Sequence, residues 1–129
     1  MSSPILYSII ESPSHPDLST LYRQLGMTEV QFKSIRKAMS QLKRQPPDFV
    51  VAEFFYGYAN NYAGVNISNL DVFLFSLQKY APQARVIVMV EKQEKNYVDP
   101  LNRIFPLHAV LQHPVRQEDV RQILNTSAV

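Results

Sequence analysis

Two residues with reactive side chains, Glu53 and His113, lie at or near the ends of short apolar segments. Glu53 lies inside the otherwise apolar run 49–55, and His113 precedes Pro114 directly after the apolar residues 109–111. A carboxylate and an imidazole at adjacent strand ends can bind a ligand or accept a proton. One His and one carboxylate, however, supply neither a full zinc shell nor an oriented catalytic triad. His15 and His108 lack the spacing of metal ligands, so no metal site is expected.

The segments that must position these residues alternate between two hydrophobic patterns. Short apolar or alternating runs that predict strands cover 5–10, 28–33, 49–55, 85–90 and 109–111. Apolar stripes at i, i+3, i+4 and i+7 predict helices over 18–25 and 35–42. A third helix should begin after a cap at Ser68 or Asn69, a fourth should run from Asp99-Pro100 to Phe105, and a fifth should follow His113-Pro114. Strands that alternate with helices imply a parallel sheet.

The predicted fold class is α/β, a flavodoxin-like three-layer α/β/α sandwich. Its five-stranded parallel sheet should have the order 2-1-3-4-5, because the half-polar strand 28–33 suits an edge. Such sheets bind ligands at the carboxyl ends of the first and third strands, which here means just after Ile10 and Ala52. With 129 residues and no linker, the chain should form one domain with its core at about 4–124.

The composition of the chain argues against several classes of partner, location and cofactor. A formal charge of +2 is too small for a basic stripe along a phosphate backbone, and we expect no nucleic-acid partner. No apolar run approaches the about 20 residues of a membrane span, and the start of the chain lacks a basic secretion signal. The chain has no Cys, which fits a reducing compartment, so a cytoplasmic location is expected. With three Gly in the chain and Glu11-Ser12-Pro13-Ser14 in place of a phosphate-binding loop, no cofactor is expected.

From Ile5 to Leu124 the layout resembles a response-regulator receiver domain of the CheY-like kind. The stretch Arg44-Gln45-Pro46-Pro47-Asp48-Phe49-Val50-Val51-Ala52-Glu53 resembles the approach to the phospho-acceptor strand. Residues 85–90 resemble the fourth strand, and Leu111-Gln112-His113-Pro114 resembles the fifth strand with its lysine-proline end. The resemblance implies a receiver fold in a two-component signalling context.

The same resemblance implies that the phosphorylation site is degenerate. Glu53 stands where the family has its acceptor aspartate. The Glu side chain is longer than that of Asp, which displaces its carboxylate from the position needed for in-line attack. The acidic pair that holds Mg²⁺ in the family falls on Ile9 and Ile10, with only Glu11 nearby. Val90 stands where the family has a Ser or Thr hydroxyl, and His113 stands where it has a lysine. Val110 stands where the family has the aromatic residue that moves on phosphorylation. A pseudo-receiver without a working switch is expected, in which Glu53 either imitates a phosphorylated aspartate or is a solvated strand-end carboxylate.

Two surfaces are candidates for a protein partner of the signalling pathway. The loop 54–66 is rich in aromatic residues and Asn, and its candidate binding residues are Phe55, Tyr56, Tyr58 and Tyr62. A second interpretation, compatible with the first, is that Phe54, Phe55 and some of the tyrosines fold down to roof the vacated pocket. The second surface is the face of the fourth helix, fifth strand and fifth helix, which commonly carries dimer contacts in receivers; here it would comprise Leu101, Arg103, Arg116 and Arg121.

Three functional hypotheses follow. The first is a phosphorylation-independent protein-interaction module without enzymatic activity. The second is a small α/β enzyme, or a cofactor- or phosphate-binding protein, that uses Glu53 and His113. The third is an active receiver that forms an acylphosphate on Glu53.

Overall fold

The chain folds around one parallel sheet, seen in a computed structural model that describes residues 3–12, 15–56 and 68–127. The strands are β1 (Ile5–Ile9), β2 (Thr28–Phe32), β3 (Phe49–Glu53), β4 (Arg85–Val90) and β5 (Ala109–Gln112). They are all parallel, in the order β2-β1-β3-β4-β5. The predicted fold class and strand order are therefore confirmed.

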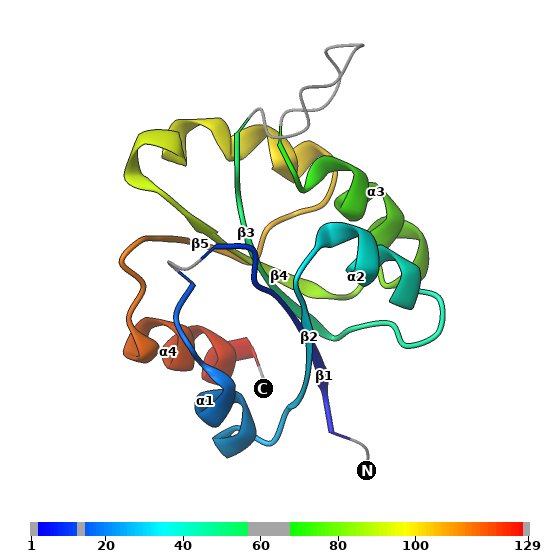
Figure 1. The fold of residues 1–129 in the computed structure, drawn as a ribbon, viewed down its shortest axis with the longest axis vertical. Helices are drawn as coiled ribbons and strands as arrows, with labels where there is room; N and C mark the ends of the chain where they lie inside the picture. Colours follow the sequence, from blue (N-terminus) through cyan, green and yellow to red (C-terminus); the bar gives the residue numbers. More distant parts are fainter. Residues whose placement is uncertain (1–2, 13–14, 57–67, 128–129) are drawn as a thin grey trace.

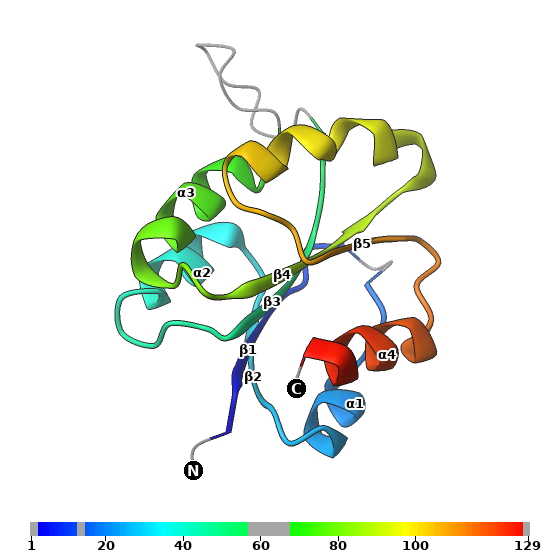
Figure 2. The same ribbon diagram turned by 180° about the vertical axis from the view of Figure 1, so that it is seen from behind.

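The helices cover both faces of the sheet (Figure 1). They are α1 (Ser19–Gln24), α2 (Ile35–Gln41), α3 (Asp71–Tyr80) and α4 (Gln117–Ser127). Viewed from either side, α2 and α3 lie on one face, and α1 and α4 lie on the other (Figures 1 and 2). Among the described residues, no helix has both the length and the apolar character required to cross a membrane.

Each face has its own apolar core, because successive strand residues point to opposite sides. On β3, Val50 and Ala52 pack in the core beneath α2 and α3, whereas Phe49 and Val51 pack in the core beneath α1 and α4. All five residues of β3 are buried, as expected of a central strand with helices on both sides.

Local signals explain most of the helix boundaries. Ser34 caps α2, because its hydroxyl accepts a hydrogen bond from Lys37 N at 3.2 Å. After α1 the chain turns at Gly26, whose φ of +76° favours glycine. The prediction that Ser68 or Asn69 caps α3 was wrong, since Leu70 is the N-cap residue and makes no side-chain cap bond. Ser68 instead belongs to a turn in which Asp71 Oδ1 accepts its backbone N–H at 2.7 Å.

The prediction of a helix from Asp99 to Phe105 also needs correction, because no α-helix forms there. Two 3₁₀ segments stand there, η1 (Lys92–Tyr97) and η2 (Asp99–Arg103). Pro100 suits the first turn of a helix, but too few residues remain before the fifth strand to extend an α-helix. Val98, Leu101 and Phe105 still point into the core beneath α2 and α3.

Candidate functional site

Glu53 ends β3 at the carboxyl edge of the sheet, and its side chain is buried at 2% exposure. Its carboxylate oxygens accept hydrogen bonds from the segment that follows β1. The backbone N–H groups of Glu11 and Ser12 both donate to Oε1 at 2.9 Å, and the Ser12 hydroxyl donates to Oε2. A buried carboxylate needs such donors to offset its lost hydration. The interpretation of Glu53 as a solvated strand-end carboxylate is thus wrong.

Asn69 connects the backbone of Glu53 and the carboxylate of Glu11 to the start of α3. Its side-chain amide donates to the Glu53 carbonyl oxygen at 2.8 Å and to Glu11 Oε2 at 3.2 Å. Its side-chain oxygen accepts the Phe55 N–H at 2.7 Å. Burial raises the pKa of Glu11; the Asn69 hydrogen bond opposes this rise, and the charge of Glu53 adds to it. The segments after β1 and β3 and before α3 are therefore held together by one side-chain network.

Three of the positions that the resemblance assigned to phosphoryl chemistry, Ile9, Ile10 and Val90, are apolar and at least half-buried. Ile9 and Val90 are core residues at 1% and 0% exposure, and Ile10 is half-buried. Within the described ranges, no three His, Asp or Glu side chains converge to hold a metal ion. Because Glu11 is turned toward Asn69 and the two residues before it are isoleucines, the residues present do not fit the carboxylate shell that Mg²⁺ requires.

Glu53 and His113 are further apart in the sheet than the sequence suggested. Glu53 ends β3 and His113 follows β5, and β4 lies between these two strands, so the expectation of adjacent strand ends was wrong. The His113 backbone N–H donates to Val90 O at 2.9 Å. No hydrogen bond or ion pair joins the Glu53 and His113 side chains in the part of the chain that the structure describes. The pairing on which the enzyme hypothesis depends is not made.

His15 belongs to this edge, although its spacing to other ligands gave no reason to include it. Burial lowers the pKa of its imidazole; the charges of Glu53 and Glu29 oppose this effect, and His113 adds to it. Its Nδ1 atom is buried and finds no hydrogen-bond partner among the described residues. His15 thus shares the electrostatic environment of Glu53 and His113.

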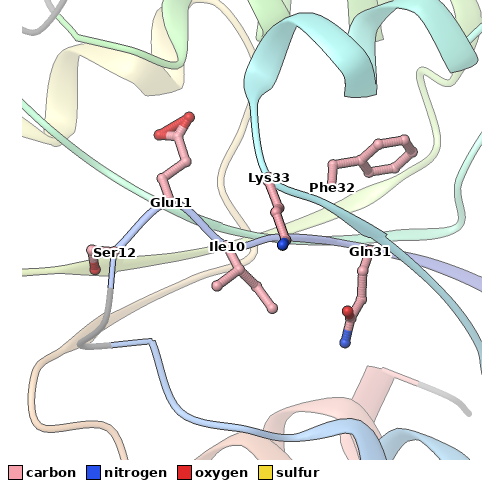
Figure 3. Close-up of a pocket in the computed structure, with 6 residues that line it drawn as sticks. All are labelled: Ile10, Glu11, Ser12, Gln31, Phe32 and Lys33. Atoms are coloured by element: carbon pink, nitrogen blue, oxygen red, sulfur yellow. The ribbon is translucent and has the colours of Figure 1, made fainter.

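A pocket of about 290 Å³ opens beside this network, where β1 and β2 end. It is lined by Ile10, Glu11, Ser12, Gln31, Phe32 and Lys33. In Figure 3 the side chains of Glu11 and Phe32 point to one side of the strands, and those of Ile10 and Gln31 point to the other. The residues from β2 were not predicted, because the sequence gives no indication that the second strand reaches the site.

The three described residues that directly follow β3 differ in their burial. Phe54 is buried at 1% exposure and Phe55 is half-buried, as expected if they roof the vacated pocket. Tyr56 is 48% exposed, and its ring stacks on Tyr97 of η1 with centroids 3.9 Å apart and planes 19° apart. Tyr58 and Tyr62 lie outside the described residues. Tyr97 was missed, because nothing in the sequence relates η1 to this loop.

The second predicted surface is only partly available. Leu101 is fully buried and cannot contact a partner, because η2 packs it against the core beneath α2 and α3. Arg103 and Arg116 are exposed. Arg116 pairs with Asp119 at 3.5 Å, while the guanidinium of Arg121 donates to Gln24 on α1 at 3.0 Å. Exposed pairs of this kind stabilise a fold little.

Comparison of the sequence with known families and curated proteins finds no match. The structure does match solved structures. A response regulator receiver domain from Clostridium thermocellum aligns with a TM-score of 0.71 at 16% identity, covering 97% of this chain and 93% of that one. The chain has the receiver fold.

Two further structures agree. The signal receiver domain of a putative Luxo repressor protein from Vibrio parahaemolyticus matches with a TM-score of 0.69 at 15% identity, over 96% of this chain and 88% of that one. A putative CpaE2 pilus assembly protein from Sinorhizobium meliloti matches with 0.67 at 16% identity, over 94% and 97%. All three structures share the fold of this chain at 16% sequence identity or less.

Proposed function

We propose that this chain is a signalling module that binds a protein partner and does so without being phosphorylated. The observation that carries the proposal is the engagement of both Glu53 carboxylate oxygens by Glu11 N, Ser12 N and the Ser12 hydroxyl. Acylphosphate formation requires a carboxylate oxygen free to approach phosphorus in line. Here that approach would first have to break hydrogen bonds inside a buried site.

The same contacts support a role for Glu53 as a fixed internal anion. Backbone N–H groups that converge on one oxygen are a common way for proteins to bind an anionic group. In this chain those donors are satisfied by the protein's own carboxylate, which is 2% exposed. Glu53 therefore holds the segment after β1 in a single arrangement, as a phosphorylated aspartate would, and no donor enzyme is needed.

Amide NMR spectra of the protein with Mg²⁺ and beryllofluoride, a phosphoryl analogue, test this proposal. We expect the resonances of Glu53, Val90 and His113 to stay in place, while a receiver domain with all its phosphorylation residues responds under the same conditions. Saturable shifts at those three residues would overturn the proposal and favour an active receiver.

A matched variant makes the experiment sharper. Glu53→Asp restores the acceptor residue type but leaves Ile9, Ile10 and Val90 in place. We expect beryllofluoride to leave the spectrum of this variant unchanged too. The variant still has Ile9 and Ile10 in place of the acidic pair that holds Mg²⁺, and Val90 in place of the hydroxyl that binds the phosphoryl oxygens. A response that appears only in Glu53→Asp would show that the acceptor residue alone silences the wild-type protein.

Self-association is part of the proposal. The surface formed by η2, β5 and α4 offers Arg103 and Arg116 as exposed contacts. Sedimentation velocity over a range of concentrations detects a dimer, and Arg116→Glu should weaken a dimer that uses this surface. A dimer unaffected by Arg116→Glu and Arg103→Glu would have to use another surface.

A further inference from the structure

Among the residues that the structure describes, four large apolar side chains are exposed. Tyr56, Val72, Phe75 and Tyr97 are 48%, 46%, 55% and 43% exposed. Single exposed apolar residues are ordinary on protein surfaces, but a group of them marks a contact surface. Val72 and Phe75 lie on α3, Tyr97 ends η1 and Tyr56 follows β3; we call these four residues the α3–η1 face.

Contacts in the layer of α3 and the 3₁₀ segments place the four residues near one another. Tyr56 forms an antiparallel bridge with Ser68, three residues before α3 begins. Val72 and Phe75 are one helical turn apart on the side of α3 opposite the buried Leu74 and Leu77. The Tyr56 ring stacks on Tyr97, which brings η1 to the same end of α3.

Two hydrogen bonds link the segments of this layer to one another. Gln78 of α3 donates to Ile104 O just after η2, and Glu94 of η1 accepts the Tyr56 N–H at 3.2 Å. In both views α3 and the 3₁₀ segments lie over the same face of the sheet (Figures 1 and 2). Rigid aromatic groups lose little entropy on binding and are frequent hot spots.

The charges of this layer indicate what kind of partner it suits. The exposed charged side chains of α3, η1 and η2 in the described residues are Lys79, Lys92, Lys95, Arg103 and Asp99. Four are cationic and one is anionic. Glu94 is half-buried and engaged with Tyr56. An acidic segment would therefore be attracted to the layer, whereas a basic one would be repelled.

We propose that the α3–η1 face docks an acidic segment of a partner protein that carries an aromatic or aliphatic anchor. The anchor would contact Phe75 and the Tyr56–Tyr97 pair, and its flanking carboxylates would face Lys95 and Arg103. This inference rests on the proposed function as a protein-interaction module and names the surface and the chemistry of its partner.

A random peptide library displayed on phage and selected against the whole chain tests the inference. We expect the enriched peptides to combine Asp or Glu with Phe, Trp, Tyr or Leu, and to shift the amide resonances of Val72, Phe75 and Tyr97. Phe75→Ser should weaken their binding about tenfold or more, and Lys95→Glu about threefold. Both residues are exposed, so folding should be preserved.

Arg23→Glu is the matched control, because it reverses an exposed charge on α1, which covers the other face of the sheet. It should leave peptide binding unchanged. Neutral or basic consensus peptides, shifts that map to α4, or a library without binders would overturn the inference. So would a dimer that Phe75→Ser dissociates, since a second copy would then cover the face. None of these outcomes depends on the beryllofluoride experiment, which tests phosphorylation independence separately.

Discussion

Glu53 and Tyr56 are close in sequence and opposite in environment. Glu53 is 2% exposed and directs a charged group inward to three donors, whereas Tyr56 is 48% exposed and directs an apolar ring outward onto Tyr97. A carboxylate would usually be the exposed residue of such a pair, and an aromatic ring the buried one. At this edge of the sheet a charged group therefore serves internal contacts, while a residue three positions later presents an apolar ring at the surface.

The largest expected effect tests how much Glu53 contributes to stability. Glu53→Ala leaves two backbone amides and a hydroxyl without their acceptor, and we expect a loss of about 2 to 4 kcal/mol in the free energy of unfolding. Glu94→Ala is the control, because Glu94 also accepts a backbone N–H but is only half-buried. It should cost less than about 1 kcal/mol in urea unfolding. Equal losses would remove the contrast between the two regions.

Asn69→Ala acts at the junction of the two regions. It removes bonds to the Glu53 carbonyl, the Glu11 carboxylate and the Phe55 N–H, and should cost about 1 to 3 kcal/mol. Because the Asn69 bond lowers the pKa of Glu11, its loss should raise that pKa further. An NMR titration of the Glu11 side chain measures the change. A pKa that falls in the variant would contradict the assigned role of Asn69.

Acidification should destabilise the protein through His15. Burial lowers the pKa of His15 in the folded chain, so the unfolded chain binds its proton more readily, and stability is lost as pH falls below about 6.5. Compared with His15→Asn, the wild type should lose stability more steeply there, by a slope of at most about one proton. Glu29, Glu53 and His113 surround the imidazole, and both proteins carry them. The raised pKa of Glu11 has the opposite effect in each and cancels. Unfolding curves between pH 5 and 8 that stay parallel would refute this assignment.

The smallest effect is expected on the exposed face. Phe75→Ser should change the free energy of unfolding by no more than about 0.5 kcal/mol, because its side chain is 55% exposed. Tyr97→Ala should cost up to about 1 kcal/mol through the lost stack on Tyr56. Thermal unfolding of both variants measures this. A large loss would mean that these side chains stabilise the fold and are not reserved for a partner.

The strands and their order could be predicted because each depends on a local pattern. The run at 49–53 is apolar on both faces and lies at the centre of the sheet, and the half-polar run at 28–32 lies at its edge. The prediction for the segment after β4 was wrong for a local reason too. Asp99-Pro100 indicates the start of a helix, but it does not distinguish an α-helix from a 3₁₀ turn. Strand patterns are more robust here because pairing with neighbours reinforces them.

The site could be predicted only in part, because its contacts depend on the backbone and on distant segments. Glu53 was recognised as an unusual carboxylate in an apolar run. Nothing in the sequence indicated that two backbone N–H groups would satisfy it, since every residue but proline offers such a donor. Asn69 and Tyr97 were missed for the other reason: their partners lie far along the chain, and only the packed layer brings them together.

The hydrogen bonds to Glu53 also make this edge a natural reporter of folding. The two donated N–H groups are separated from their acceptor by 42 and 41 positions along the chain. Closing a loop of that length is opposed by chain entropy, so these bonds should form only once β1 and β3 are paired. The amide protons of Glu11 and Ser12 should therefore exchange with deuterium no faster than those in the middle of β3. Their exchange rates would then follow the opening of the whole sheet, although the residues themselves lie in a connecting segment.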